Sequence, residues 1–119
     1  MLRVVEDEPE QLLLRMAKGD RAALERLFSA EAGRLLAVAR RIVRRLDLAE
    51  EVVQEAFVAA WKRAGQYDPA RGSARGWLTT IVRNRALNLL RDSARMEHHA
   101  PEVLETMGDR TADAIAAYS

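Results

Sequence analysis

Apolar residues recur every three or four positions over most of this chain, which is the period of helices with one buried face. In residues 72–95 the repeat is made of Trp77, Leu78, Ile81, Val82 and Leu89. A second row with the same period is polar and contains Thr80, Asn84, Asn88, Arg91 and Arg95. We predict one helix here, capped by Ser73, with a buried face and a solvated face.

Three more helices are predicted before it. Pro9 suits the first turn of a short helix that ends at Gly19, and Asp20 caps a long second helix. The apolar side of that second helix contains Leu24, Leu27, Phe28, Leu35, Val38, Ile42 and Val43. A third helix covers residues 47–65 and begins at Asp47, and its broad apolar side contains Leu48, Val52, Val53, Ala56, Phe57, Ala60 and Trp61.

The composition favours the same fold class. Ala, Leu, Arg and Glu are abundant and β-branched runs are few, so we predict an all-α fold. Its form is a compact bundle of three principal helices plus a short N-terminal helix. At 119 residues the chain fits one domain, over residues 9–97, with a flexible leader over 1–8 and a linker or tail over 98–119.

Several function classes are disfavoured by what the sequence lacks. There is no cysteine, and the adjacent His98 and His99 point different ways on a helix, so we expect no metal and no cofactor. Neither a phosphate-binding glycine loop nor a nucleophile motif occurs, so we expect no enzyme. No apolar run reaches about 20 residues and the N-terminus is acidic, which predicts a cytoplasmic protein without membrane insertion.

Positive charge is concentrated in residues 72–95. Five arginines and one acid give this segment a charge of +4, whereas the whole chain carries only +1. Arg and Asn combine attraction to phosphate with hydrogen bonding to base edges, so nucleic acid is the first partner to consider. Two alternatives stay open: a solvated arginine face, or a helical interaction domain whose basic face binds an acidic protein.

The connector over residues 66–72 places Tyr67 and Arg71 just before the basic helix. An aromatic ring on such a loop is a natural stacking platform for an unpaired base. Tyr67 and Trp77 are equally compatible with the core. For Trp77 we expect packing in the core to be the main role.

The third helix has a charged side opposite its apolar side. Glu51, Gln54, Glu55 and Val58 lie together there by the three-and-four rule. This patch is either plain solvated surface or a docking site for a basic partner helix.

Two stretches in fixed order resemble a known family. They are DLAEEVVQEAFVAAWKRAGQYDP, residues 47–69, and GSARGWLTTIVRNRALNLLRDSAR, residues 72–95. Together they resemble region 2 of bacterial sigma factors, specifically the group-four or extracytoplasmic function type. The resemblance extends over about residues 12–95, and the motifs V-V-Q-E-A-F and G-W-L-x-x-I-x-R-N are specific in combination.

The resemblance implies a role for each face. The helix with the Q-E-A-F motif would dock on the β′ clamp helices of core RNA polymerase through Glu51, Gln54, Glu55 and Val58. The loop and basic helix would recognise the non-template strand of the promoter −10 element and help to melt it. Candidate DNA-binding residues are Tyr67, Arg71, Ser73, Trp77, Thr80, Arg83, Asn84, Asn88 and Arg91. An anti-sigma factor covering both faces is a further expected partner.

The chain also departs from the family pattern. A full factor carries a second helical domain, region 4, and residues 98–119 are too few to form one. We therefore expect region 2 plus part of the interdomain linker, as a fragment or a truncated product. The loop QYDPARGSARG differs from common family versions in its Pro69 and in the small or basic residues before Trp77. The resemblance therefore does not predict which bases this chain prefers.

Overall fold

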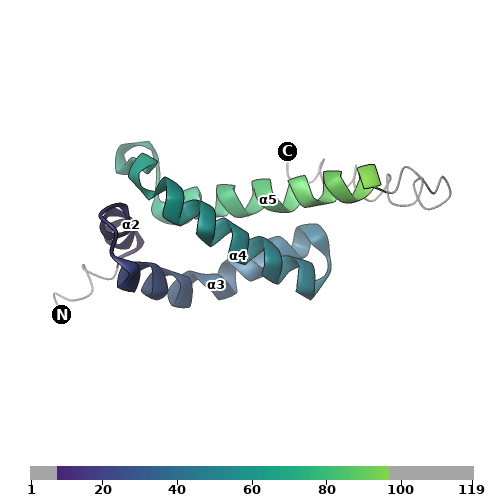
Figure 1. The fold of residues 1–119 in the computed structure, drawn as a ribbon, viewed down its shortest axis with the longest axis horizontal. Helices are drawn as coiled ribbons and strands as arrows, with labels where there is room; N and C mark the ends of the chain where they lie inside the picture. Colours follow the sequence, from purple (N-terminus) through teal and green to yellow (C-terminus); the bar gives the residue numbers. More distant parts are fainter. Residues whose placement is uncertain (1–7, 97–119) are drawn as a thin grey trace.

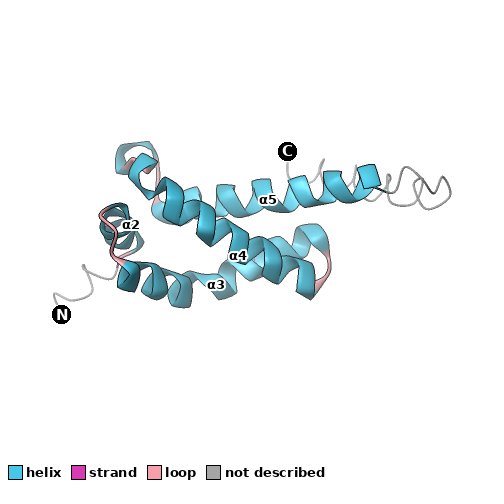
Figure 2. Ribbon diagram, viewed as in Figure 1, coloured by secondary structure: helices cyan, strands magenta, loops and turns pink. Residues whose placement is uncertain are grey.

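A computed structural model describes residues 8–96, and its regular structure there is entirely helical (Figure 2). The α-helices are α2 (Pro9–Ala17), α3 (Arg21–Val43), α4 (Leu46–Arg63) and α5 (Ala74–Met96). Two short 3₁₀ turns, η1 (Ala64–Gln66) and η2 (Pro69–Arg71), lie between α4 and α5. The predicted bundle of three principal helices with a short N-terminal helix is confirmed.

The three long helices pack against one another along their lengths, and α2 lies at the end where α3 begins (Figure 1). Helix α2 also contacts η1 and the start of α5, so it sits beside the connector that precedes the basic helix. The predicted tail over 98–119, with both histidines, lies outside the described residues, as does the predicted leader except Glu8.

Local signals set the helix boundaries. The Asp20 side chain caps α3 as predicted, because it accepts hydrogen bonds from the amides of Ala22 and Ala23. Helix α4 begins at Leu46, one residue earlier than predicted. Asp47 therefore lies inside the first turn, where its carboxylate pairs with Arg45 at 2.7 Å.

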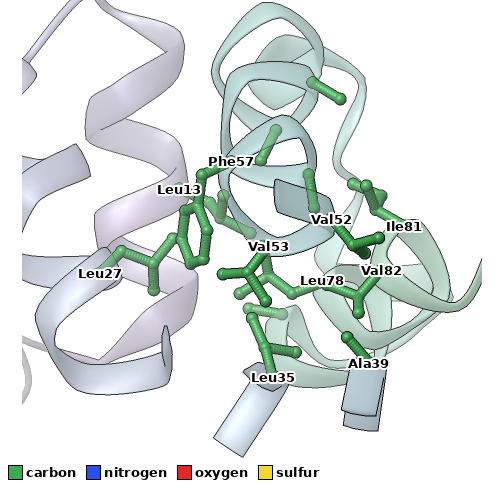
Figure 3. Close-up of a cluster of buried hydrophobic side chains, with 14 of the residues drawn as sticks. Leu13, Leu27, Leu35, Ala39, Val52, Val53, Phe57, Leu78, Ile81 and Val82 are labelled. Atoms are coloured by element: carbon green, nitrogen blue, oxygen red, sulfur yellow. The ribbon is translucent and has the colours of Figure 1, made fainter. Parts of the chain in front are cut away.

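The core is built where α3, α4 and α5 meet (Figure 3). Leu27, Leu35, Val52, Leu78 and Val82 are almost completely buried there, and the predicted apolar stripes of the long helices supply most of the remaining side chains. Burial of each such aliphatic side chain stabilises the fold by about 1.5–3 kcal/mol. Buried alanines on every long helix let the helices approach closely.

Phe28 lies on the predicted apolar side of α3 but is not part of the buried core. Its side chain is 40% exposed, and its ring meets the Phe57 ring edge to face at a centroid distance of 5.0 Å. Trp61 is also only half-buried, packed against the edge of the core. Both rings lie between α3 and α4 on the outside of the bundle.

Candidate nucleic-acid interface

A pocket of about 430 Å³ opens where the connector meets the first turns of α5. It is lined by Gln66, Tyr67, Asp68, Arg71, Gly72, Ser73, Gly76, Trp77 and Thr80. Five of the nine predicted DNA-binding residues are therefore gathered around one cavity.

The connector is shaped by local interactions. The Asp68 carboxylate accepts from the amide of Ala70 at 2.9 Å, which with Pro69 closes the η2 turn. Gly72 then has φ of +153° and ψ of 175°, a conformation that is available essentially only to glycine. The sequence signals Asp-Pro and Arg-Gly thus produce a tight double turn directly before α5.

Tyr67 is a wall of this pocket and not an open platform. Its side chain is only 7% exposed, and its ring packs against the Trp77 ring at a centroid distance of 5.6 Å. Burial, and then the nearby carboxylates of Glu10 and Asp68, raise the pKa of its hydroxyl above the ordinary value. The interpretation of Tyr67 as an exposed stacking platform is wrong for this conformation, and the core alternative holds.

Trp77 combines the two roles that the sequence left open. Its indole is half-buried and packed against the core, while part of it lines the pocket. A ring held in this way can present its remaining surface to a flat ligand at little cost in side-chain entropy.

Ser73 caps α5 as predicted, because its hydroxyl accepts from the amide of Gly76 at 3.0 Å. A second cap comes from a distant helix. The Glu10 carboxylate on α2 accepts from the amide of Ala74 at 2.9 Å, and its negative charge suits the positive end of the helix dipole. Two of the free amides in the first turn of α5 are therefore satisfied by side chains.

The predicted polar row runs along the outer face of α5. Thr80, Asn84, Asn88 and Arg91 are all exposed, and each lies three or four residues from the next. Arg91 donates to the side-chain oxygen of Asn88 at 3.1 Å, so these two groups are held side by side. Arg83 differs from the row, because it is half-buried.

A buried carboxylate near the interface was missed by sequence reasoning. Glu31 on α3 is 2% exposed and accepts from Arg34 and from Arg75, each at 3.0 Å. One of the five arginines of the basic segment is thus neutralised within the protein. Glu31 lies four residues after Leu27 and four before Leu35, so its place on the apolar stripe was the signal that could have revealed it.

The charged side of α4 is exposed as predicted. Glu51, Gln54 and Glu55 lie at the surface, and Val58 is 54% exposed. Glu55 approaches Arg85 of α5 at 3.9 Å, a surface pair of small energetic value.

An apolar groove of about 580 Å³ adjoins this face between α3 and α4. It is lined by Leu24, Glu25, Phe28, Ser29, Gln54, Phe57, Val58 and Trp61. The sequence did not indicate it, because the exposure of Phe28 was not expected.

Other kinds of site find no support in the part of the chain that the structure describes. Over residues 8–96 no group of three or more His, Cys, Asp or Glu is placed to hold a metal ion. Within the same range no helix has the length and apolar character needed to cross a bilayer.

Comparison with known proteins agrees with this geometry. The family described as Sigma-70 region 2 matches residues 27–96, which contain α4, the connector and α5. The chain belongs to the sigma-70 region 2 family. Sigma factors act by recognition and not by catalysis, and this supports the prediction that the chain is not an enzyme.

Curated relatives of this region 2 domain are of the extracytoplasmic function type. The chain is 33% identical over 82 residues to the ECF RNA polymerase sigma factor SigK of Mycobacterium tuberculosis (strain ATCC 25618 / H37Rv). The aligned residues cover 69% of this chain and 44% of the relative. The chain is 28% identical over 115 residues to the SigK of Mycobacterium ulcerans (strain Agy99), covering 93% of this chain and 62% of the relative. The matched part of the chain thus spans less than two thirds of the length of each of these relatives.

Proposed function

We propose that this region 2 domain acts in transcription initiation, docking on core RNA polymerase and recognising the promoter −10 element, which it helps to melt. Family membership and the names of the SigK relatives support the general role. Such a role would be carried out in the cytoplasm, where RNA polymerase acts. It requires two separate surfaces, one for DNA and one for the polymerase.

The continuity of the pocket with the polar row is the observation that carries the DNA half of the proposal. Thr80 belongs to both, since it lines the pocket and begins the row of Asn84, Asn88 and Arg91. A single strand lying along α5 would place one base at the pocket and the following nucleotides beside amide and guanidinium groups.

Capture of a base in the pocket would offset part of the cost of melting. Taking a base out of the stack costs a few kcal/mol. Stacking of the extruded base on an aromatic side chain returns roughly 1–3 kcal/mol, and Trp77 is the ring with exposed surface in this pocket. Arg71 at the rim and Arg91 farther along α5 would hold the strand by its phosphates.

The other predicted DNA-binding residues would mainly form and fix the pocket in this proposal. Tyr67 forms the pocket wall and Ser73 fixes the start of α5. Arg83 is half-buried, so we assign it a contact at the edge of the strand and not a place in the row.

For the polymerase half, we assign docking on the β′ clamp helices to Glu51, Gln54, Glu55 and Val58. Their exposure on one side of α4 supports this, with Val58 supplying an apolar centre among polar groups. Acidic side chains on this face suit a basic partner helix. An anti-sigma factor that covered both faces would block polymerase and DNA together.

The docking half is tested by binding of the chain to an isolated β′ clamp-helix fragment. Gln54→Ala and Glu55→Arg should each weaken binding by tenfold or more, while Gln11→Ala, an exposed amide on α2, should leave it unchanged. Absence of binding by the folded wild-type chain would refute the assignment. It would favour the alternative that the basic face binds an acidic protein.

The DNA half is tested with a random-sequence pool of labelled single-stranded DNA. Selection should enrich a defined sequence, and its affinity should fall steeply as salt is raised, because phosphate contacts release counterions. Equal affinity for all sequences, or none for single strands, would contradict recognition of the −10 element.

A further inference from the structure

Two acidic side chains from different helices hold the first turn of α5. Glu10 of α2 accepts from the amide of Ala74 at 2.9 Å. Glu31 of α3 accepts from the guanidinium of Arg75 at 3.0 Å. The two contacts join residues 64 and 44 positions apart in the sequence, so they are tertiary anchors and not local capping.

The Glu31 contact is part of a closed network. Its second oxygen accepts from Arg34, and Arg34 also donates to the Thr79 hydroxyl at 2.9 Å and to the Arg75 carbonyl at 3.4 Å. A carboxylate that is 2% exposed is costly unless it is fully paired, so this network is favourable only when the start of α5 lies against α3.

These anchors act on the backbone that forms the pocket. Ala74 and Arg75 lie between Ser73 and Gly76, both of which line the cavity. The Ser73 hydroxyl also bonds the Gly76 amide, so a shift of Ala74 would move this wall and the Trp77 ring next to it. Glu10 and Glu31 themselves do not line the cavity.

We propose that Glu10 and Glu31 are positioning residues, which hold the first turn of α5 so that the pocket is preformed for an unpaired base. This inference rests on the proposed function. Preformation matters because a loop that must be ordered on binding loses affinity by the cost of that ordering.

Removal of Glu10 or Glu31 should change the affinity for DNA in the direction opposite to that expected from the change in charge alone. Removal of a carboxylate makes the chain more positive and should strengthen its attraction for phosphates. Loss of a positioning contact should instead weaken capture of the base. Glu50 on α4 is an exposed glutamate, whereas Glu10 is half-buried and tied to α5, so Glu50 provides the control for the change in charge alone.

The experiment measures binding of the full chain to the single-stranded DNA selected from the random pool. Glu10→Ala should bind about threefold to tenfold more weakly than wild type, whereas Glu50→Ala should bind equally or more tightly. Glu10→Gln keeps an acceptor oxygen for the Ala74 amide and should restore most of the affinity. Glu31→Gln provides a second test if it folds, and should also weaken binding.

A spectroscopic readout separates positioning from general loss of stability. Trp61 and Trp77 are the two tryptophans of the sequence, so a Trp61→Phe background leaves Trp77 as a reporter of the pocket. In that background Glu10→Ala should shift the emission of the folded chain to longer wavelength before DNA is added. Glu50→Ala should leave the emission unchanged.

The outcomes distinguish this inference from the proposed function. If wild type captures single strands and Glu10→Ala behaves as Glu50→Ala, positioning is refuted while the DNA role stands. A Glu10→Gln variant as weak as Glu10→Ala would also refute it, because the hydrogen bond to Ala74 would then not be the cause. Failure of wild type to bind any single strand would overturn both.

Discussion

The hydroxyl of Tyr67 donates a hydrogen bond to the carbonyl oxygen of Gly72 at 3.0 Å. This bond joins the two ends of the connector and closes it into a ring that includes the η2 turn. On the connector side, the pocket wall is therefore held by this part-buried hydrogen bond together with the packing of Tyr67 on Trp77.

Replacement of Tyr67 by Phe should lower the free energy of unfolding by about 1 kcal/mol, because the hydrogen bond to Gly72 is lost while the ring packing is kept. Urea denaturation at pH 7 measures the change. Unaltered stability would show that the bond does not hold the connector.

The same variant should also change the response to alkaline pH. The pKa of Tyr67 is raised in the folded state above its ordinary value of 10.0, chiefly by burial. As pH rises, the Tyr67 proton is therefore lost from the unfolded chain at a lower pH than from the folded chain. The contribution of Tyr67 to stability is fully present below pH 10 and is lost as pH rises through the folded pKa. Tyr67→Phe should remove this part of the decline in denaturation curves from pH 8 to pH 12. An identical decline in the variant would contradict the assignment.

Gly72→Ala should destabilise the chain by roughly 1–3 kcal/mol, because φ of +153° is strained for any residue with a Cβ atom. Gly33 in α3 is a matched control: a Cβ there meets no atom within 4 Å, and alanine is the better helix former by about 1 kcal/mol. Gly33→Ala should therefore raise the melting temperature and Gly72→Ala should lower it. Equal shifts in thermal melts would contradict the strain argument.

Asn84→Ala should weaken binding to the selected single strand by roughly fivefold to tenfold, the loss of about one hydrogen-bonding contact. Its stability should change by less than about 0.5 kcal/mol, because the side chain is exposed. Fluorescence anisotropy measures the affinity, and Gln11→Ala on α2 is the control with a similar loss of an exposed amide. Full affinity in the variant would show that Asn84 does not contribute to DNA binding.

The stability of the chain in acid should depend on Asp20. The hydrogen bond from Arg15 is the main cause that lowers the pKa of this carboxyl below its ordinary value of 3.8. The unfolded chain therefore takes up its proton first, so the stabilisation is present above pH 3.8 and is lost as pH falls through the folded pKa. Asp20→Asn keeps a capping oxygen but has no charge to titrate. Thermal melts from pH 6 to pH 2 should show a shallower decline for this variant, and a decline as steep as that of wild type would exclude the role.

Local signals predicted much of this fold. Pro9, Asp20 and Ser73 each mark a helix start because the reason is contained within a few neighbouring residues. The start of α4 was misplaced by one residue, because Arg45 at the N-cap makes no side-chain capping bond and so leaves no local signal.

The candidate site could be predicted only in part, because its decisive contacts are tertiary. Periodicity places Asn84 on an outer face from a single helix, and the structure agrees. It cannot tell that Tyr67 turns inward onto Trp77. The bond from Ala74 to Glu10 joins two elements that no local pattern relates.

The Glu10–Ala74 bond also has a consequence for synthesis of the chain. A bond between residues 64 positions apart cannot form until α3, α4 and the connector have all left the ribosome. The pocket would therefore be among the last features to become ordered, and a nascent chain that stops before α5 would lack the wall formed by Gly76, Trp77 and Thr80.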